Sequence, residues 1–94
     1  MITWDEKKSR ANLKKHGVSF ESAQFVFDDP LHLSLQDRVV DGELRWQTMG
    51  MVGDVMVLLV AHTWHEAETG EEHIRIVSAR RALKKERKVY EQGA

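Results

Sequence analysis

The chain of 94 residues contains no cysteine and a single proline. Without cysteine it can form neither a disulfide nor a thiolate metal site. Its longest apolar run, VMVLLVA at residues 55–61, is far too short to span a bilayer. The N-terminal stretch MITWDEKKSR lacks the apolar segment of a signal peptide, so we expect a cytoplasmic protein that does not enter a membrane.

Net charge is also nearly absent, at -1, but the charges are unevenly distributed. Residues 5–16 hold five of the 14 Lys and Arg residues, and residues 80–88 hold six. Between residues 17 and 77 there are 11 acids and only three cations. If the two basic ends fold beside each other, they form a cationic surface that suits phosphates. Ordinary solvated helix faces are the alternative.

The periodicity and capping signals predict one α+β domain over residues 1–94. A first helix is expected over about 5–16, ended by Gly17, and a second from a Ser19 cap to the segment before Pro30. Turn signals and alternation then predict strands at 31–40, 43–52, 55–64 and 73–78, followed by a helix over 79–91. The expected order is two N-terminal helices, a four-stranded antiparallel meander and a C-terminal helix.

The register of the predicted hairpins places several charged side chains on one sheet face. If Asp41-Gly42 and Gly53-Asp54 are two-residue turns, Arg45 lies opposite both Arg38 and His62. Alternation gives a polar face made of Arg38, Glu43, Arg45, His62 and Arg75, and an apolar face with Leu33, Leu35, Leu44 and Trp46. An ordinary solvated face with weak salt bridges is the alternative.

The run Ser78-Ala79-Arg80-Arg81 lies where the fourth predicted strand meets the last helix. Arg80 would begin that helix, so its guanidinium would be held rigidly and could grip a phosphate bidentately. Glu86 falls on the apolar stripe of the helix and should have a cationic partner. We therefore expect Arg45, Arg75 and Arg80 to surround one anion-sized hollow beside the last two strands.

Both ends of the chain resemble the BrnT-type toxins, small ribonucleases of type II toxin–antitoxin modules with a RelE-like fold. The similar stretches are WDEKKSRANLKKHGVSFESAQFVFDDP and HIRIVSARRALKKERKVYE. The marks that carry the resemblance are Trp4-Asp5, Lys8, Asn12, Lys15-His16-Gly17-Val18, Phe20, Ala23, Asp29-Pro30, Arg75-Ile76, Ser78-Ala79-Arg80, Ala82, Glu86-Arg87 and Tyr90.

The resemblance implies an endoribonuclease that needs no metal or other cofactor and arrests translation by cleaving RNA. It also implies a cognate antitoxin of the BrnA type that binds and silences the toxin. In such modules the antitoxin brings the DNA-binding element, so operator DNA would be contacted only through it.

Metal-free RNA cleavage needs a proton acceptor for the 2′-hydroxyl, cations around the phosphate and a proton for the leaving oxygen. We expect His62 and Glu43 to be the proton-transfer groups, and Arg45 and Arg80 to contact the phosphate. The expected RNA-binding residues are Lys8, Lys15, His16, Arg75 and Lys84. The alternatives are a hydrogen-bonded core role for His62 and simple solvation for the lysines.

Three other assignments of the same residues are open to the sequence. His62, His65 and His73 suggest a metal site, but His62 and His65 would point to opposite faces of a strand, so no metal is expected. A polar sheet face with basic ends also suits a non-enzymatic nucleic-acid-binding or protein-binding module. An inactive toxin homologue that acts as a corepressor is a further alternative.

Overall fold

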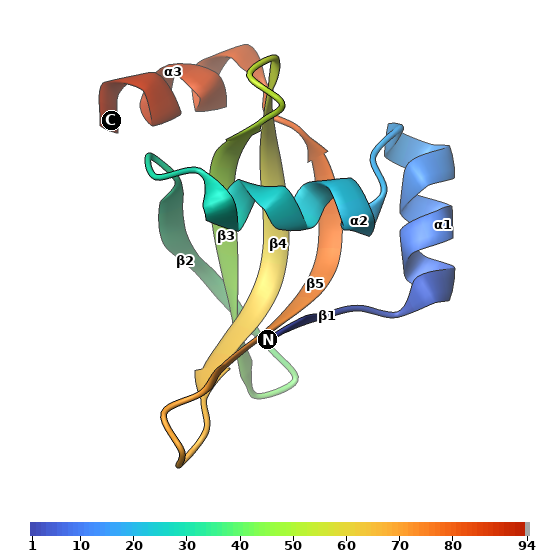
Figure 1. The fold of residues 1–94 in the computed structure, drawn as a ribbon, viewed down its shortest axis with the longest axis vertical. Helices are drawn as coiled ribbons and strands as arrows, with labels where there is room; N and C mark the ends of the chain where they lie inside the picture. Colours follow the sequence, from blue (N-terminus) through green and yellow to red (C-terminus); the bar gives the residue numbers. More distant parts are fainter. Residues whose placement is uncertain (94) are drawn as a thin grey trace.

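The computed structural model describes residues 1–93, and these form an α+β arrangement of five strands and three α-helices (Figure 1). In chain order the elements are β1 (Ile2–Thr3), α1 (Glu6–His16), α2 (Phe20–Ala23), the 3₁₀ helix η1 (Gln24–Asp28), β2 (Leu33–Val40), β3 (Glu43–Val52), β4 (Met56–Glu66), β5 (Glu72–Arg81) and α3 (Lys84–Gly93). Ala94, the last residue of the predicted domain, lies outside the described residues. Within the described part, no helix is long and apolar enough to cross a membrane.

The sheet has the strand order β1-β5-β4-β3-β2. Strands β2 to β5 form the predicted antiparallel meander, and β4 lies at its centre, as its apolar residues 57–60 require. The prediction of four antiparallel strands was incomplete, because β1 pairs in parallel with β5 through Ile2 and Ile74. The sheet is therefore five-stranded and mixed.

The N-terminal helices begin and end at the predicted caps. The Asp5 side chain accepts hydrogen bonds from the first-turn N–H groups of α1, and Gly17 ends that helix with a φ of 74°. Ser19 caps α2 by accepting from Ser22 N. The second predicted helix is only partly α-helical, because after four residues it continues as the 3₁₀ helix η1, which ends before Pro30.

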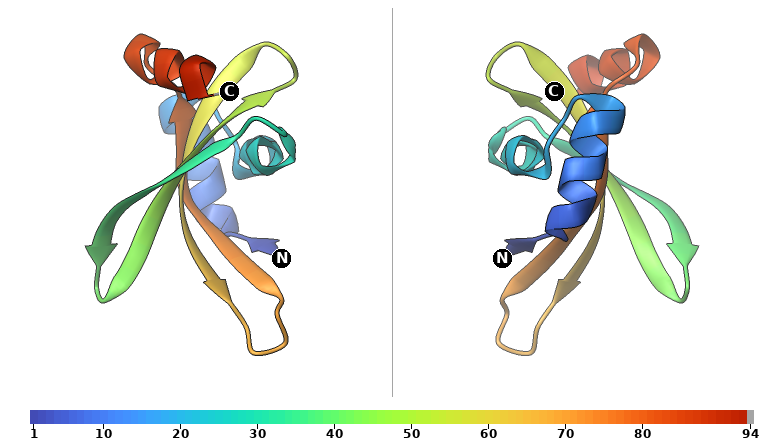
Figure 2. Two further views of the ribbon diagram at one scale, coloured as in Figure 1. Left: turned by 90° about the vertical axis from the view of Figure 1, so that its left-hand side faces the viewer. Right: turned by 90° about the vertical axis from the view of Figure 1, so that its right-hand side faces the viewer.

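Two apolar clusters lie on opposite faces of the sheet. The larger one joins α2 and η1 to the sheet through buried residues that include Phe20, Val26, Leu58 and Ile76. The smaller one lies under α3, where Tyr90 packs with Met49, Val57 and Leu59. Figure 2 shows α3 on the side of the sheet opposite α2. Because α3 covers only one end of its face, the remainder of that face is open.

The junction near Arg80 differs from the prediction. Strand β5 continues to Arg81, and α3 begins only at Lys84. Arg80 therefore belongs to the strand, where it pairs with Leu59 of β4. Its position is fixed by the sheet rather than by the start of a helix.

Gly50 of β3 allows η1 to approach the sheet closely. A Cβ atom built at Gly50 would lie 2.6 Å from Val26 O and 2.8 Å from Val26 Cβ. We expect Gly50→Ala to lower the free energy of unfolding by about 1–3 kcal/mol, because backbone atoms of η1 must move. Urea denaturation measures this change.

Gly93→Ala is the matched control, because its Cβ would meet only the Leu33 side chain, at 3.6 Å from Cδ2 and 4.0 Å from Cδ1. Gly93 is the last residue of α3 and does not have a positive φ, so alanine should be close to neutral there. Equal stability of Gly50→Ala and the wild type would contradict the close packing of η1 on β3.

Candidate functional site

The β3–β4 turn is one residue longer than predicted, and this changes the position of His62. Gly53, Asp54 and Val55 form the turn, so Val52 pairs with Met56. Arg45 then pairs with Thr63, and His62 pairs with Trp46. The predicted pairing of Arg45 with His62 is wrong, because a shift of one residue moves a side chain to the other face.

His62 lies on the face of the sheet that α2 and η1 cover, and it is fully buried there. Its Nδ1–H donates to Thr63 O at 3.0 Å, so its Nε2 accepts from the Thr48 hydroxyl at 2.7 Å. The hydroxyls of Ser34 and Thr48 are also hydrogen-bonded to each other, at 2.7 Å, and Phe27 packs edge-on against the imidazole. Burial lowers the pKa of His62, against the opposing effect of the bond to Thr63 O. The structure therefore separates His62 from the predicted arginine site.

The arginines lie on the open face because β5 contains an irregularity. Arg75 pairs with Thr63 and Arg80 pairs with Leu59, so five steps along β5 match only four along β4. The register shift leaves Val77 as the extra residue, as in a β-bulge. Without it, Arg75 and Arg80 would point to opposite faces, because their spacing is odd. With it, both share the face of Arg45, which we call the arginine face (Arg45, Arg75 and Arg80).

Two of the three guanidinium groups are paired with acids. Arg75 Nη2 donates to Glu43 Oε1 at 3.0 Å, and both groups are about half exposed. Arg80 donates from Nη1 and Nη2 to the two oxygens of Glu86 at 2.8 and 2.9 Å. Glu86 therefore has the cationic partner that the sequence predicted.

Glu86 also connects the arginine face to α3. Its Oε1 accepts from Leu83 N at 2.7 Å, which ties the carboxylate to the start of the helix. The hydrogen bonds from Arg80 lower the pKa of Glu86, although burial opposes this, and the same bonds raise the pKa of Arg80. The ion pair therefore keeps both side chains charged and holds the Arg80 guanidinium in one orientation.

Arg45 differs from the other two arginines. Its side chain is half-buried, and no carboxylate of the described residues forms a salt bridge with it. Its Nε is the one buried side-chain nitrogen or oxygen in that part of the chain without a hydrogen-bond partner. Buried donors are nearly always satisfied, so Arg45, unlike Arg75 and Arg80, keeps a charged donor without an internal partner.

The arginine face is a track rather than the single hollow that the sequence suggested. Arg45 and Arg75 are two strand spacings apart, about 10 Å, and Arg80 lies about 13 Å further along β5, from the standard sheet spacings. Gln47, Ala61 and Ser78 form the row between them. Figure 2 shows this surface between α3 and the β2–β3 hairpin. Its length suits several consecutive phosphates, which rise about 3.4 Å each in a stacked strand.

The remaining predicted site residues lie elsewhere. Lys8, Lys15 and His16 are exposed on α1, which Asn12 fastens to β5 through bonds to Ala79 N and Ala79 O. Lys84 is exposed at the start of α3. The predicted pairing of Arg38 with Arg45 is wrong, because the register of β2 shifts between Gln36 and Val39. Arg38 is instead 76% exposed beside Asp37.

The histidines do not form a metal site. His65 and His73 are cross-strand partners whose rings stack at 5.4 Å, whereas His62 is buried on the helix-covered face. Among residues 1–93, no three His, Asp or Glu side chains are grouped so that they could hold an ion.

Sequence reasoning missed two features of the site. One is the bulge at Val77, whose only trace in the sequence is that Ile76 and Ala79, an odd number of residues apart, are both apolar. Both are buried in the same cluster. The other is the bond from the Tyr90 hydroxyl to Asp29, which holds α3 on the sheet and has no local signal in the sequence.

A family model described as "Ribonuclease toxin, BrnT, of type II toxin-antitoxin system" matches residues 4–86. Among solved structures, the 1.1 Å crystal structure of the Brucella abortus ribonuclease toxin BrnT is similar, with a TM-score of 0.59 and 21% sequence identity. The match covers 88% of this chain and 96% of that one. At this identity it shows a common fold. No curated protein matches the sequence.

The buried His62 makes stability depend on pH. Because burial places its folded-state pKa below the unfolded value of about 6.5, the unfolded chain binds the proton first. This contribution to the free energy of unfolding is fully present above that value and is lost as the pH falls below it. Between about pH 8 and about pH 5, the free energy of unfolding measured by denaturation should therefore fall more steeply for the wild type than for His62→Gln.

His62→Gln should also lower the free energy of unfolding by about 1–3 kcal/mol at the alkaline end, since Thr48 loses one of its two buried hydrogen-bond partners and keeps only Ser34. The exposed His16 provides the control, because His16→Gln also removes one imidazole but no buried hydrogen bond. Parallel pH profiles for the wild type and His62→Gln would contradict the assignment.

Proposed function

The chain belongs to the BrnT family of ribonuclease toxins of type II toxin–antitoxin systems, and from this premise we propose that it cleaves RNA on the arginine face without a metal ion. Family membership makes the protein an endoribonuclease and gives it a cognate antitoxin. We propose that one domain, residues 1–94, carries the whole activity.

The observation that carries this proposal is the common orientation of Arg45, Arg75 and Arg80 on an open sheet face. Arginine suits a phosphate because its planar guanidinium donates two parallel hydrogen bonds and stays charged. Rigid strands hold these groups in place before RNA arrives, so little reorganisation is needed as charge develops on the phosphate.

In the proposed reaction the 2′-oxygen attacks the adjacent phosphorus while the bond from phosphorus to the 5′-oxygen breaks. Glu43 accepts the 2′-hydroxyl proton, and water supplies a proton to the leaving 5′-oxygen. The Glu43 carboxylate lies beside Arg75, with 42% of its side chain exposed, so substrate can reach it. Arg45, two residues from Glu43 on the same face of β3, stabilises the negative charge on the reacting phosphate. Arg80, further along the track, binds a neighbouring phosphate and positions the strand.

His62 takes no part in the proposed reaction, because its ring is fully buried on the opposite face and both of its nitrogens are hydrogen-bonded. We propose that Lys8, Lys15, His16 and Lys84 attract the RNA backbone from α1 and α3. These side chains are exposed, so their contribution should be electrostatic and sensitive to salt.

The proposed cellular role follows from the chemistry. RNA cleavage in the cytoplasm would arrest translation, and a BrnA-type antitoxin would silence the enzyme. Operator DNA would be contacted through that antitoxin, since the open face of this chain is assigned to RNA.

Substitution of the arginines tests the site. We expect Arg45→Ala and Arg80→Ala each to slow cleavage of a fluorescent RNA by about 10²–10³-fold in EDTA. Arg45→Ala removes a cation from the reacting phosphate, and Arg80→Ala removes a contact that positions the strand. Arg38→Ala is the matched control, since it removes an exposed arginine at the edge of the sheet.

Wild-type rates from both arginine variants would contradict the site. A wild-type enzyme that cleaves only with added divalent metal would contradict the proposed mechanism but not the family assignment. Circular dichroism of each variant would separate a lost cation from a lost fold.

A further inference from the structure

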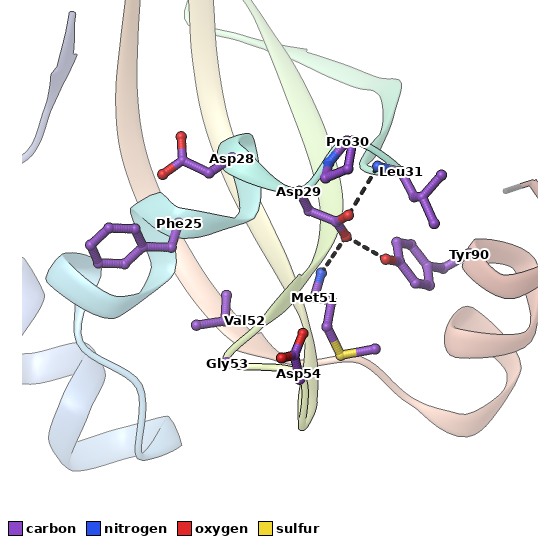
Figure 3. A pocket seen from close by; sticks show the side chains of 10 residues that line it. All are labelled: Phe25, Asp28, Asp29, Pro30, Leu31, Met51, Val52, Gly53, Asp54 and Tyr90. Carbon is purple, nitrogen blue, oxygen red and sulfur yellow. Dashed lines mark hydrogen bonds between the residues drawn. The ribbon is translucent and has the colours of Figure 1, made fainter.

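A groove of about 740 Å³ lies at the corner formed by η1, the β3–β4 turn and α3 (Figure 3). Its apolar lining includes Phe25, Leu31, Met51 and Val52. Phe25 is 51% exposed and Leu31 is 52% exposed. Val55, on the β3–β4 turn, is 82% exposed. Large apolar side chains that gather in a concave surface mark a contact site more often than isolated exposed ones do.

The groove is held in shape by one carboxylate. Asp29 accepts hydrogen bonds from Leu31 N at 2.9 Å, from Met51 N at 2.7 Å and from the Tyr90 hydroxyl. These bonds outweigh the effect of burial and lower the pKa of Asp29, while burial and Asp29 itself raise the pKa of Tyr90 to about 12. Three walls of the groove are thus joined, so a partner would meet a preformed surface and lose little binding energy to ordering it.

The charge at the groove is of one sign. Asp28 and Asp54 are exposed among its lining residues, and the described lining contains no Lys, Arg or His. Carboxylates repel an RNA backbone, so the groove does not extend the arginine face. They favour a polypeptide that carries cations beside its apolar side chains.

We propose that the groove, defined by Phe25, Asp28, Leu31, Val52 and Asp54, is the place where the cognate antitoxin docks. The docking segment would carry apolar side chains that fill the groove, flanked by Lys or Arg that meet Asp28 and Asp54. A second copy of this chain fits less well, because a twofold contact would bring the same carboxylates face to face.

The docking site and the proposed RNA site are separate surfaces. The groove opens beside η1, whereas the arginine face lies on strands β3 and β5. The groove would therefore serve as an anchor for the antitoxin, and its loss should weaken binding without slowing cleavage by the free toxin. The inference rests on the antitoxin that the family supplies, and on the proposed function only for the position of the RNA.

Truncation of the exposed apolar residues tests the anchor. The purified cognate antitoxin is titrated into the wild type and the double variant Phe25→Ala/Leu31→Ala by calorimetry. We expect the double variant to bind at least about tenfold more weakly, because both side chains lose their contacts. Leu13→Ala, a 50% exposed leucine on α1, is the matched control and should bind like the wild type.

Charge removal gives a second test that hardly disturbs folding. Asp28→Asn/Asp54→Asn should slow association with the antitoxin at least about threefold at low salt and flatten its salt dependence. Asp41→Asn is the control, because Asp41 and Asp54 both occupy turns at positive φ, 51° and 59°. Asparagine tolerates that conformation, so both variants should fold normally.

Each outcome bears on one claim. Unchanged antitoxin affinity in both groove variants would overturn the docking site, as would a loss of RNA cleavage by these variants when they are free. A wild-type dimer in light scattering that becomes a monomer in Phe25→Ala/Leu31→Ala would assign the groove to a second copy instead. A wild type that binds antitoxin through the groove but cleaves no RNA would leave the docking site standing and refute the proposed cleavage.

Discussion

The arginine face depends on one extra residue in β5. Strands alternate strictly, so Arg75 and Arg80 can share a face only where the alternation is interrupted, and the register shift at Val77 interrupts it. The same irregularity allows Ile76 and Ala79 to enter the same core cluster on the other side. Burial of apolar residues on one face and placement of cations on the other are therefore a single constraint. A strand without the bulge would meet neither requirement.

The two faces of the sheet have different roles. On one face, α2 and η1 complete the main core, and a chain of hydroxyl and imidazole hydrogen bonds satisfies His62 inside it. On the other face, α3 covers one end with Tyr90 and leaves the arginine track open. Since residues 57–60 of β4 are buried, the three arginines come from the flanking strands β3 and β5.

The sequence was sufficient for much of this architecture because the signals are local. Gly17 ends a helix, Asp41-Gly42 turns a hairpin, and the apolar residues of β4 require a central position. It was insufficient for register, because a three-residue turn at Gly53–Val55 and a bulge at Val77 each shift the pairing by one residue. Hence Arg45 and Arg75 were assigned to the correct face, whereas His62 was assigned to the wrong one. The parallel strand β1 is only two residues long and has no periodic pattern to detect.

The bond between Tyr90 and Asp29 joins residues 61 positions apart, and β5 supplies two of the three arginines late in the chain. Such contacts form only after most of the polypeptide is available, because the chain must lose loop-closure entropy before distant residues can stabilise the fold. A nascent chain that still lacks β5 and α3 therefore has neither a completed arginine track nor a closed groove.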